Sequence, residues 1–536
     1  MEENIIFTPK NRNLLSLFAT TVRVVCVLII LLALVGCGKN GIDGKDGKDG
    51  KDGKDGKDGI TPTISISEDG YWVINGEKTD VKAEGKDGAD GKDGADGKDG
   101  TNTDGNSASY NPQGLQFYPN DDGDYIVAVG NAKYLSKIVI PETYNGGKVV
   151  GIDNQAFSNC SSLTEIVIPD SVTTIGTSAF YNCDSLTSIV IPNNVTTIGS
   201  YAFAYCSSLT SIVIPDSVTT IGQAAFHWCT SLSSVVIPDS VTTIGNYAFE
   251  SCSSLSSVVI GDSVTTIGDS AFQSCSKLSS VVIGNSVTTI GDSAFRDCDS
   301  LTSIVIPDGV TTIGFNMFYS CDSLSSVVIP DSVTTIGDYA FYSCSKLSSV
   351  VIPDGVTSIG DRAFYSCSNL TAVYISDVAK WCTISFVSST SNPLYYAKNL
   401  YVNDVLATEL IIPDGATAIG NYAFYCCDSL TSIVIPDSVT TIGNYAFAFC
   451  NSLSSVVIGD SVTTIGYHAF YVCESLSSVV IPNSVTTIYG YAFSGCYSLT
   501  DVYYTGTKEQ WSQIIIFGDN DPIRNATIHY NYVSEN

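Results

Sequence analysis

The chain has 536 residues, 54 acidic against 25 basic side chains, and a net charge of -29. Proteins bind nucleic acid largely by using Lys and Arg to release counterions, so this balance disfavours a nucleic-acid partner and leaves a neutral or basic one open. One ordinary core does not grow to this length, whereas a repeat array grows lengthwise and gains solubility from surface acidity.

The first 36 residues are typical of an export signal. Basic residues precede a short apolar run from 24 to 36, which has the length of a signal-peptide core and is too short to span a bilayer. The run ends in Leu34-Val35-Gly36-Cys37, which resembles a bacterial lipobox. This resemblance implies cleavage after Gly36 and acylation of Cys37, with two or three acyl chains giving lasting attachment. We predict a lipoprotein signal peptide over 1–36 and an exported, cell-surface protein anchored through Cys37; an uncleaved anchor or a chance cysteine is the alternative.

Two low-complexity runs follow, a Gly-Lys-Asp linker over 37–60 and a second one over 85–108. Glycine at every third position resembles collagen, but the runs are short and contain no proline. We therefore favour a flexible, hydrated stalk and leave a trimeric stalk as the alternative. Alternation and two turn signals predict a small β-hairpin-like segment over 61–84. Such spacers resemble those of gut-bacterial surface lipoproteins.

A repeat of 23 residues fills most of the remaining chain. The phrase is A-F-x-x-C-x-x-L-x-x-[IV]-x-I-[PG]-x-x-V-T-x-I-G, and a phenylalanine lies three residues before each register cysteine. The register cysteines are Cys160, Cys183, Cys206, Cys229, Cys252, Cys275, Cys298, Cys321, Cys344, Cys367, Cys427, Cys450, Cys473 and Cys496.

We predict that each copy of the 23-residue repeat forms one turn, or rung, of a stacked coil. In the copy around Cys344, the apolar set Leu347, Val350 and Ile352 fits a short strand, which Pro353 ends because proline cannot donate the next ladder bond. One copy cannot hide its apolar side chains alone, but stacked copies can.

The part of the repeat that precedes this strand is predicted to form a tight turn and then a single helical turn. Gly337 suits a turn with positive φ, and Asp338 suits the N-cap of a single helical turn that ends near Cys344.

The register cysteines are predicted to be buried free thiols. Equivalent residues on successive rungs point the same way at about 4.8 Å spacing, whereas a disulfide needs two Cβ atoms that face each other. Cysteine is a small apolar residue that suits a tight interior turn. Cys382 and Cys426 lie outside the register, and either is a candidate for exposure.

The repeat resembles the BspA-type, or treponemal-type, leucine-rich repeats of surface proteins. The resemblance implies a leucine-rich repeat solenoid with a parallel β-sheet on its concave face and short helical turns on its convex face. It also implies adhesion to matrix proteins or to other cells. The expected organisation is a first array over 109–375 with an aberrant first rung, a non-repeat island over 376–408, a second array over 409–503 and a C-terminal cap over 504–536.

The island and the cap have matching sequences, so a duplicated module is expected. Trp381 and Trp511 occupy equivalent positions and are predicted to be core anchors rather than ligand-stacking residues. The copy at the end of the chain is expected to cover the last sheet edge, and the internal copy to interrupt or bend the array.

The sequence predicts neither an enzyme nor a cofactor. The three histidines lack a nucleophile in a recognisable motif, and no phosphate-binding or zinc-protease motif occurs. No catalytic residue and no metal ligand is therefore assigned. A ladder of aspartates at a turn is expected to cap that turn, with calcium as the alternative: Asp216, Asp239, Asp262, Asp308, Asp331 and Asp354.

The candidate binding site is an outward-facing stripe along the strands. By alternation, the residue between two buried positions of each strand faces out, beside a Ser or Thr two residues earlier. We predict that this stripe binds a protein or peptide ligand, such as host matrix or other cells, without nucleic acid and with the membrane contacted only through the anchor. The alternatives are that valine merely suits exposed strands, that the protein is a passive spacer, or that it captures glycans. The stripe comprises Val190, Val213, Val236, Val259, Val282, Val305, Val328, Val351 and Tyr374, and it resumes at Val434, Val457, Val480 and Tyr503.

Overall fold

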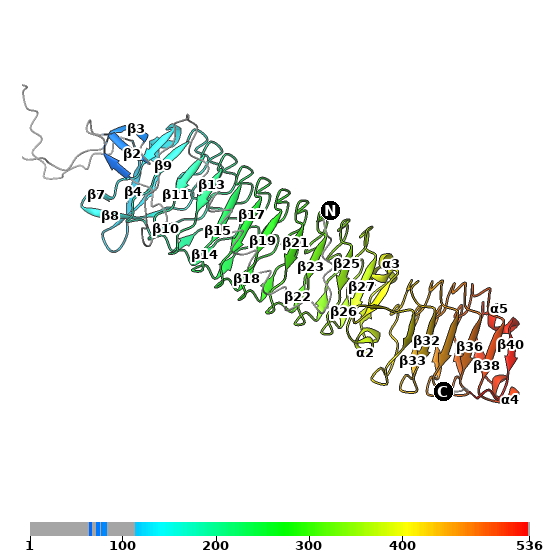
Figure 1. Cartoon of the computed structure of the whole chain (residues 1–536). Coiled ribbons are helices and arrows are strands. Elements are labelled where there is room, and N and C mark those ends of the chain that lie inside the picture. The colour runs from blue at the N-terminus through cyan, green and yellow to red at the C-terminus, as the bar shows by residue number, and fades with distance from the viewer. Residues whose placement is uncertain (1–63, 67–70, 75–76, 83–112, 534–536) are drawn as a thin grey trace, which may run out of the picture.

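The computed structural model describes residues 64–66, 71–74, 77–82 and 113–533. From residue 113 onward the chain forms a long rod of stacked rungs (Figure 1). Each rung contributes a three- or four-residue strand to one face and usually a two-residue strand to a second face, and neighbouring strands pair in parallel. The predicted leucine-rich repeat solenoid is therefore confirmed.

We call the surface formed by the longer strands the strand face. Its strands pair at equivalent positions of successive rungs, so Ser188 lies opposite Ser211 and Val190 opposite Val213. They are β6 Lys137–Val139, β9 Glu165–Val167, β11 Ser188–Val190, β13 Ser211–Val213, β15 Ser234–Ile237, β17 Ser257–Ile260, β19 Ser280–Val282, β21 Ser303–Val305, β23 Ser326–Val328, β25 Ser349–Val351, β27 Ala372–Ile375, β29 Leu400–Val402, β31 Glu409–Ile411, β32 Ser432–Ile435, β34 Ser455–Ile458, β36 Ser478–Ile481, β38 Asp501–Tyr504 and β40 Thr527–His529.

The second face carries mostly two-residue strands, most of which have the sequence Thr-Ile. They are β8 Gly147–Ile152, β10 Thr174–Ile175, β12 Thr197–Ile198, β14 Thr220–Ile221, β16 Thr243–Ile244, β18 Thr266–Ile267, β20 Thr289–Ile290, β22 Thr312–Ile313, β24 Thr335–Ile336, β26 Ser358–Ile359, β28 Ser385–Phe386, β33 Thr441–Ile442, β35 Thr464–Ile465, β37 Thr487–Ile488 and β39 Ile515–Ile516.

The remaining elements lie at the ends of the rod and in the island. An antiparallel sheet of β1 Ile64–Ile66, β2 Tyr71–Ile74 and β3 Glu77–Lys82 falls within the segment where a hairpin is expected. The first rungs add β4 Gln116–Pro119, β5 Tyr125–Ala128, η2 Gly130–Tyr134 and β7 Thr143–Tyr144. The island contains α2 Val378–Cys382, η3 Ser389–Ser391, α3 Leu394–Ala397 and β30 Val405–Leu406, and the cap contains α4 Lys508–Trp511 and α5 Asp521–Asn525.

The third side of each rung, which we call the turn face, is not helical, and this corrects the sequence prediction. Two residues per rung have positive φ, for example Tyr339 at 56° and Ser343 at 59°. Their N–H groups donate to the next rung, from Tyr339 to the Asp361 carbonyl at 2.9 Å and from Ser343 to the Tyr365 carbonyl at 2.9 Å. A helical turn would keep these bonds within one rung, so the stack replaces helix with interlocked turns.

Gly337 also differs from its prediction, because its φ is not positive. An added Cβ would instead lie 2.9 Å from the Gly314 carbonyl carbon of the preceding rung. Glycine is required there because the backbones of successive rungs approach too closely for a side chain.

The core is one continuous column along the rod, from Leu115 to Ile523. Its centre is a spine of parallel phenylalanines, with ring centroids 5.2 Å apart for the pair Phe180 and Phe203. Trp381, only 1% exposed, lies where the island interrupts this spine, and its Nε1 donates to the Ala423 carbonyl at 2.8 Å.

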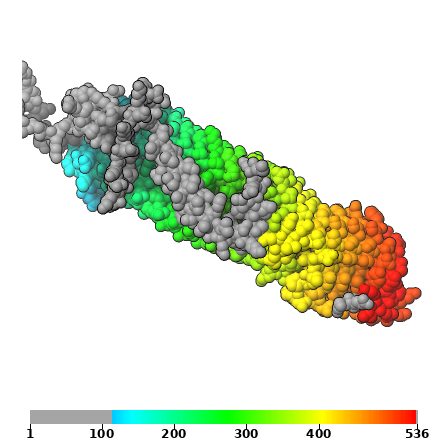
Figure 2. All heavy atoms as spheres, viewed as in Figure 1, coloured from blue at the N-terminus to red at the C-terminus, as the bar shows by residue number. Residues whose placement is uncertain are grey.

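The island is one of several places along the rod where the hydrogen-bonded sheets end, and the core continues through it. On the strand face one sheet ends with β29 and β30 and the next begins at β31; on the second face one sheet ends at β28 and the next begins at β33. In Figure 2 the yellow residues around the island fill the space between the green and orange rungs without a gap. The two arrays are thus joined by core packing and by individual hydrogen bonds, such as that from the Gly420 N–H to the Cys382 carbonyl at 2.8 Å, rather than by a continuous ladder.

Candidate functional site: the two long faces of the rod

The register cysteines are buried and unbridged. Each typical thiol donates to the carbonyl of the phenylalanine in the preceding rung, as Cys344 does to Phe318 at 3.2 Å. Burial raises the pKa of Cys367 to about 12, so this thiol stays protonated and unreactive at neutral pH. Cys382 and Cys426, the candidates for exposure, are also buried, so that expectation is wrong. Cys382 lies at the end of α2, packed into the island core.

Two members of the aspartate ladder accept hydrogen bonds from backbone N–H groups of the following rung. Asp239 accepts from the backbone N–H of Asp262 at 2.7 Å, and Asp262 accepts from that of Asn285 at 3.1 Å. A second ladder does the same at the turns, where Asp338 accepts from the N–H of Asp361 at 2.6 Å. Among the residues that the structure describes, no cluster of His, Cys, Asp and Glu is arranged to hold a metal ion.

The histidines contact carboxylates or tyrosines. His227 Nδ1 lies 3.1 Å from Glu250, and His529 Nε2 lies 2.7 Å from Asp501. His468 is stacked between Tyr445 and Tyr491, with ring centroids 4.5 and 4.8 Å away.

The valine stripe is exposed in part. Val190, Val213 and Val236 are 45%, 68% and 41% exposed and follow one another along three rungs. Val305 and Val434 are also exposed, while Val282, Val328, Val351, Val457, Val480 and Tyr503 are half-buried.

Two members of the stripe do not face solvent as predicted. Val259 is only 8% exposed and lies in register between Val236 and Val282. Tyr374 is 6% exposed, because its ring stacks on Tyr401 at 4.7 Å.

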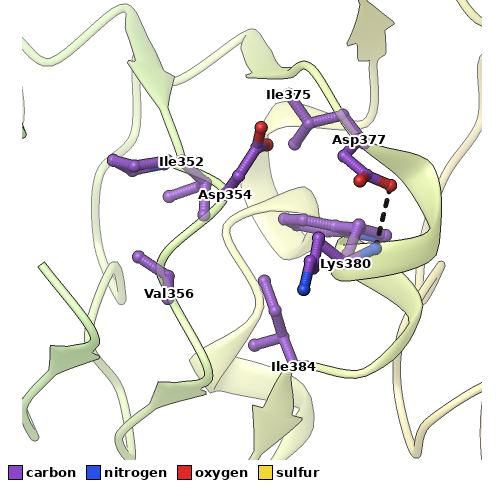
Figure 3. Close-up of a pocket in the computed structure, with 9 residues that line it drawn as sticks. Ile352, Asp354, Val356, Ile375, Asp377, Lys380 and Ile384 are labelled. Carbon is purple, nitrogen blue, oxygen red and sulfur yellow. Dashed lines mark hydrogen bonds between the residues drawn. The ribbon is translucent and has the colours of Figure 1, made fainter. Parts of the chain in front are cut away.

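A small hollow lies where the first array meets the island (Figure 3). Ile352, Val356 and Ile384 form its apolar wall, and Asp377 caps α2 by accepting from the N–H groups of Ala379 and Lys380. Its volume is about 10 Å³, enough for one water molecule at most. This hollow is therefore part of the joint rather than a ligand site.

The sequence analysis missed an aromatic surface on the turn face. Tyrosines recur two residues before the register cysteine, and three of them stack in a ladder: Tyr319, Tyr342 and Tyr365. Together with Tyr339 and Tyr395 they line an open hollow of about 500 Å³. The sequence carries this signal as a tyrosine two residues before several register cysteines, on the turns rather than on the strands.

The fold and these two faces define a leucine-rich repeat solenoid. The model of the BspA type leucine rich repeat region (6 copies) matches residues 150–279, 265–392 and 397–521, which is more than half of the chain. The chain therefore belongs to the BspA-type leucine-rich repeat proteins, a family of bacterial surface proteins.

Several solved structures resemble the chain. A leucine-rich repeat protein from Bacteroides ovatus is 28% identical, with 79% of this chain and 99% of that one covered and a TM-score of 0.54. A leucine rich cell surface protein from Faecalibacterium prausnitzii is 27% identical over 76% of this chain and 97% of that one, with a TM-score of 0.32. The T. pallidum leucine-rich repeat protein is 34% identical over 36% of this chain and 90% of that one, with a TM-score of 0.35. None of the curated proteins compared with the chain matches it.

No helix among the described residues is long and apolar enough to cross a membrane. Cys37, the predicted lipid-anchor residue, and the two linkers lie outside the described residues.

Proposed function

We propose that this chain is an exported lipoprotein, tethered at Cys37, that binds a protein partner through its strand face rather than carrying out a reaction. The observation that carries the proposal is the run of exposed valines at Val190, Val213 and Val236. Contiguous apolar side chains on an exposed sheet favour a protein or peptide partner, since their burial provides most of the energy of such contacts.

The chemistry around the stripe supports a neutral or basic partner surface. The chain carries a net charge of -29, which repels acidic partners at long range. Ser188, Ser211 and Ser234 lie two residues before these valines, so the apolar run is bordered by hydroxyl groups that can donate and accept hydrogen bonds.

The test is a triple variant that replaces the apolar run with alternating charges, Val190→Glu, Val213→Lys and Val236→Glu. Opposite charges on neighbouring strands stabilise a sheet, so the rod should stay folded. We expect at least a tenfold loss of binding to immobilised fibronectin, laminin or type I collagen, whichever the parent chain binds.

The matched control carries the same changes on the second face of the same rungs, Thr174→Glu, Thr197→Lys and Thr220→Glu, and should bind like the parent. Two results would contradict the proposal. One is unchanged binding by a folded strand-face variant; the other is a parent chain that captures none of the three matrix proteins, which would favour a passive spacer.

A further inference from the structure

The hollow on the turn face is built from two columns of side chains and an end wall. One column is the ladder Tyr319, Tyr342 and Tyr365, and the other is Tyr339 with Arg362. The end wall comes from the island, where Ser388, Thr390 and Tyr395 close the hollow. Its volume of about 500 Å³ lies within the range of about 300–1,000 Å³ that is typical of small-ligand sites.

The tyrosine ladder opens toward the island. The ring centroids of Tyr319 and Tyr342 are 4.7 Å apart and nearly parallel, and those of Tyr342 and Tyr365 are 5.7 Å apart. Tyr365 and Tyr395 then lie 6.3 Å apart with a 38° tilt. Because the spacing of the rings increases in this direction, the rings near the island cover one another less completely. All the tyrosines that line the hollow are half-buried.

The rim of the hollow holds one charge of each sign. Arg362 lies over the Tyr339 ring and its Nη1 donates to the Tyr339 hydroxyl at 2.9 Å. The neighbouring carboxylate of Asp361 accepts a hydrogen bond from the Ser388 hydroxyl at 2.7 Å. The Nε of Arg362 lies 3.9 Å from the same carboxylate. The pair gives a donor and an acceptor side by side without a net charge, so the hollow selects for a neutral ligand rather than an ion.

Backbone groups contribute little to recognition here. The N–H groups of Tyr339 and Ser343 donate to the next rung, and that of Tyr342 donates to the Tyr339 carbonyl at 3.1 Å. A peptide that adds to a sheet edge needs such groups, so the turn face does not offer that mode of binding. What remains is aromatic surface edged with hydroxyls and one carboxylate–guanidinium pair.

We propose that this hollow binds a neutral oligosaccharide. A sugar ring presents C–H groups that pack against aromatic side chains, and adjacent hydroxyls that both donate and accept hydrogen bonds. The tyrosines match the first property. The phenolic hydroxyls together with Asp361 and Arg362 match the second. Since the hollow lies on the turns and the valine stripe on the strands, this activity is separate from the proposed protein binding.

The test is calorimetric titration of the purified full chain with maltohexaose, cellohexaose, xylohexaose and mannohexaose. Parallel titrations use a sialylated hexasaccharide and a proline decamer, since aromatic-lined grooves also bind proline-rich peptides. We expect at least one neutral hexasaccharide to bind at micromolar to millimolar concentration. The double variant Tyr342→Ala with Tyr365→Ala should weaken that binding at least tenfold.

Three further variants sharpen the interpretation. Tyr181→Ala, at the same repeat position outside the hollow, should bind the sugar like the parent. Tyr342→Phe with Tyr365→Phe keeps the stack and should lose only the part of the affinity that the hydroxyls provide. The strand-face valine variant should bind the sugar normally, which separates failure of this proposal from failure of the other.

Several outcomes would overturn the proposal. Binding of the proline decamer alone would assign the hollow to a peptide, and binding of the sialylated sugar alone would show that charge dominates. The proposed sugar site would be rejected if no neutral hexasaccharide bound at millimolar concentration. It would also be rejected if the double alanine variant, with the melting temperature of the parent, bound the sugar as well as the parent does.

Discussion

Gly222 shows how closely the backbones of neighbouring rungs approach each other. An added Cβ would lie 2.6 Å from the Ser200 nitrogen and 2.7 Å from the Gly199 carbonyl carbon, both backbone atoms of the preceding rung. Backbone cannot move aside as a side chain can, so the repeated glycine sets how tightly the rod stacks.

Gly222→Ala should therefore destabilise the rod by about 1–3 kcal/mol, the usual cost of overpacking. Gly415→Ala is the matched control, since its added Cβ would meet only the Ala379 side chain at 3.7 Å. Urea denaturation followed by circular dichroism measures both. Equal midpoints for the two variants would show that the rungs separate at little cost.

The sequence predicted the residues that one rung determines alone. The 23-residue period, the buried phenylalanines and the inward cysteines follow from which side chains are apolar and how they are spaced. The helical turn and the role of Gly337 were mispredicted, because both depend on bonds and contacts with the next rung. Burial of Tyr374 was missed for the same reason, since the stacking partner Tyr401 belongs to the island.

At the scale of elements, the island is the joint between two arrays. The sheets stop there, but Trp381 reaches across to the Ala423 carbonyl of the second array, and Asn392 Nδ2 donates to the Tyr422 carbonyl at 2.7 Å. The equivalent Trp511 in the cap is only half-buried and packs edge-on against Tyr504. One duplicated sequence thus has two roles, set by whether another rung follows.

Trp381→Ala should cost about 3–5 kcal/mol, the range for truncating a buried tryptophan. Because the bridging contact is lost, the arrays should unfold in two thermal transitions instead of one coupled transition, as measured by scanning calorimetry. Trp511→Ala, the control in the C-terminal cap, should cost less and leave the shape of the transition unchanged. A single unsplit transition in the Trp381 variant would contradict a joint held by this residue.

On the scale of the whole molecule, the buried thiols form a column that runs the length of the repeats. Burial raises the pKa of the Cys344 thiol well above its ordinary value, and that of Cys367 and Cys427 to about 12. In an unfolded chain a thiol has a pKa of about 8.5. The two states therefore hold different numbers of protons at alkaline pH.

The sign follows from that difference. Above about pH 8.5 the unfolded chain loses thiol protons and the folded chain keeps them, so stability falls as pH rises. Each of these raised-pKa thiols should contribute a slope that rises to about 1.4 kcal/mol per pH unit as the pH passes above 8.5. Urea titrations between pH 8 and 9.5 measure the slope, and Cys344→Ala with Cys367→Ala should make it shallower. A slope unaffected by these substitutions would show that the thiols are not responsible.

Each rung bonds to equivalent atoms of the next rung, and this affects how the number of repeats can change during evolution. Deleting or duplicating one whole repeat removes or adds one rung. The contacts between the remaining neighbouring rungs stay equivalent. Near-identical repeats in a gene also recombine readily out of register. Lineages carrying this protein can therefore change the length of the rod without having to redesign the island or the C-terminal cap.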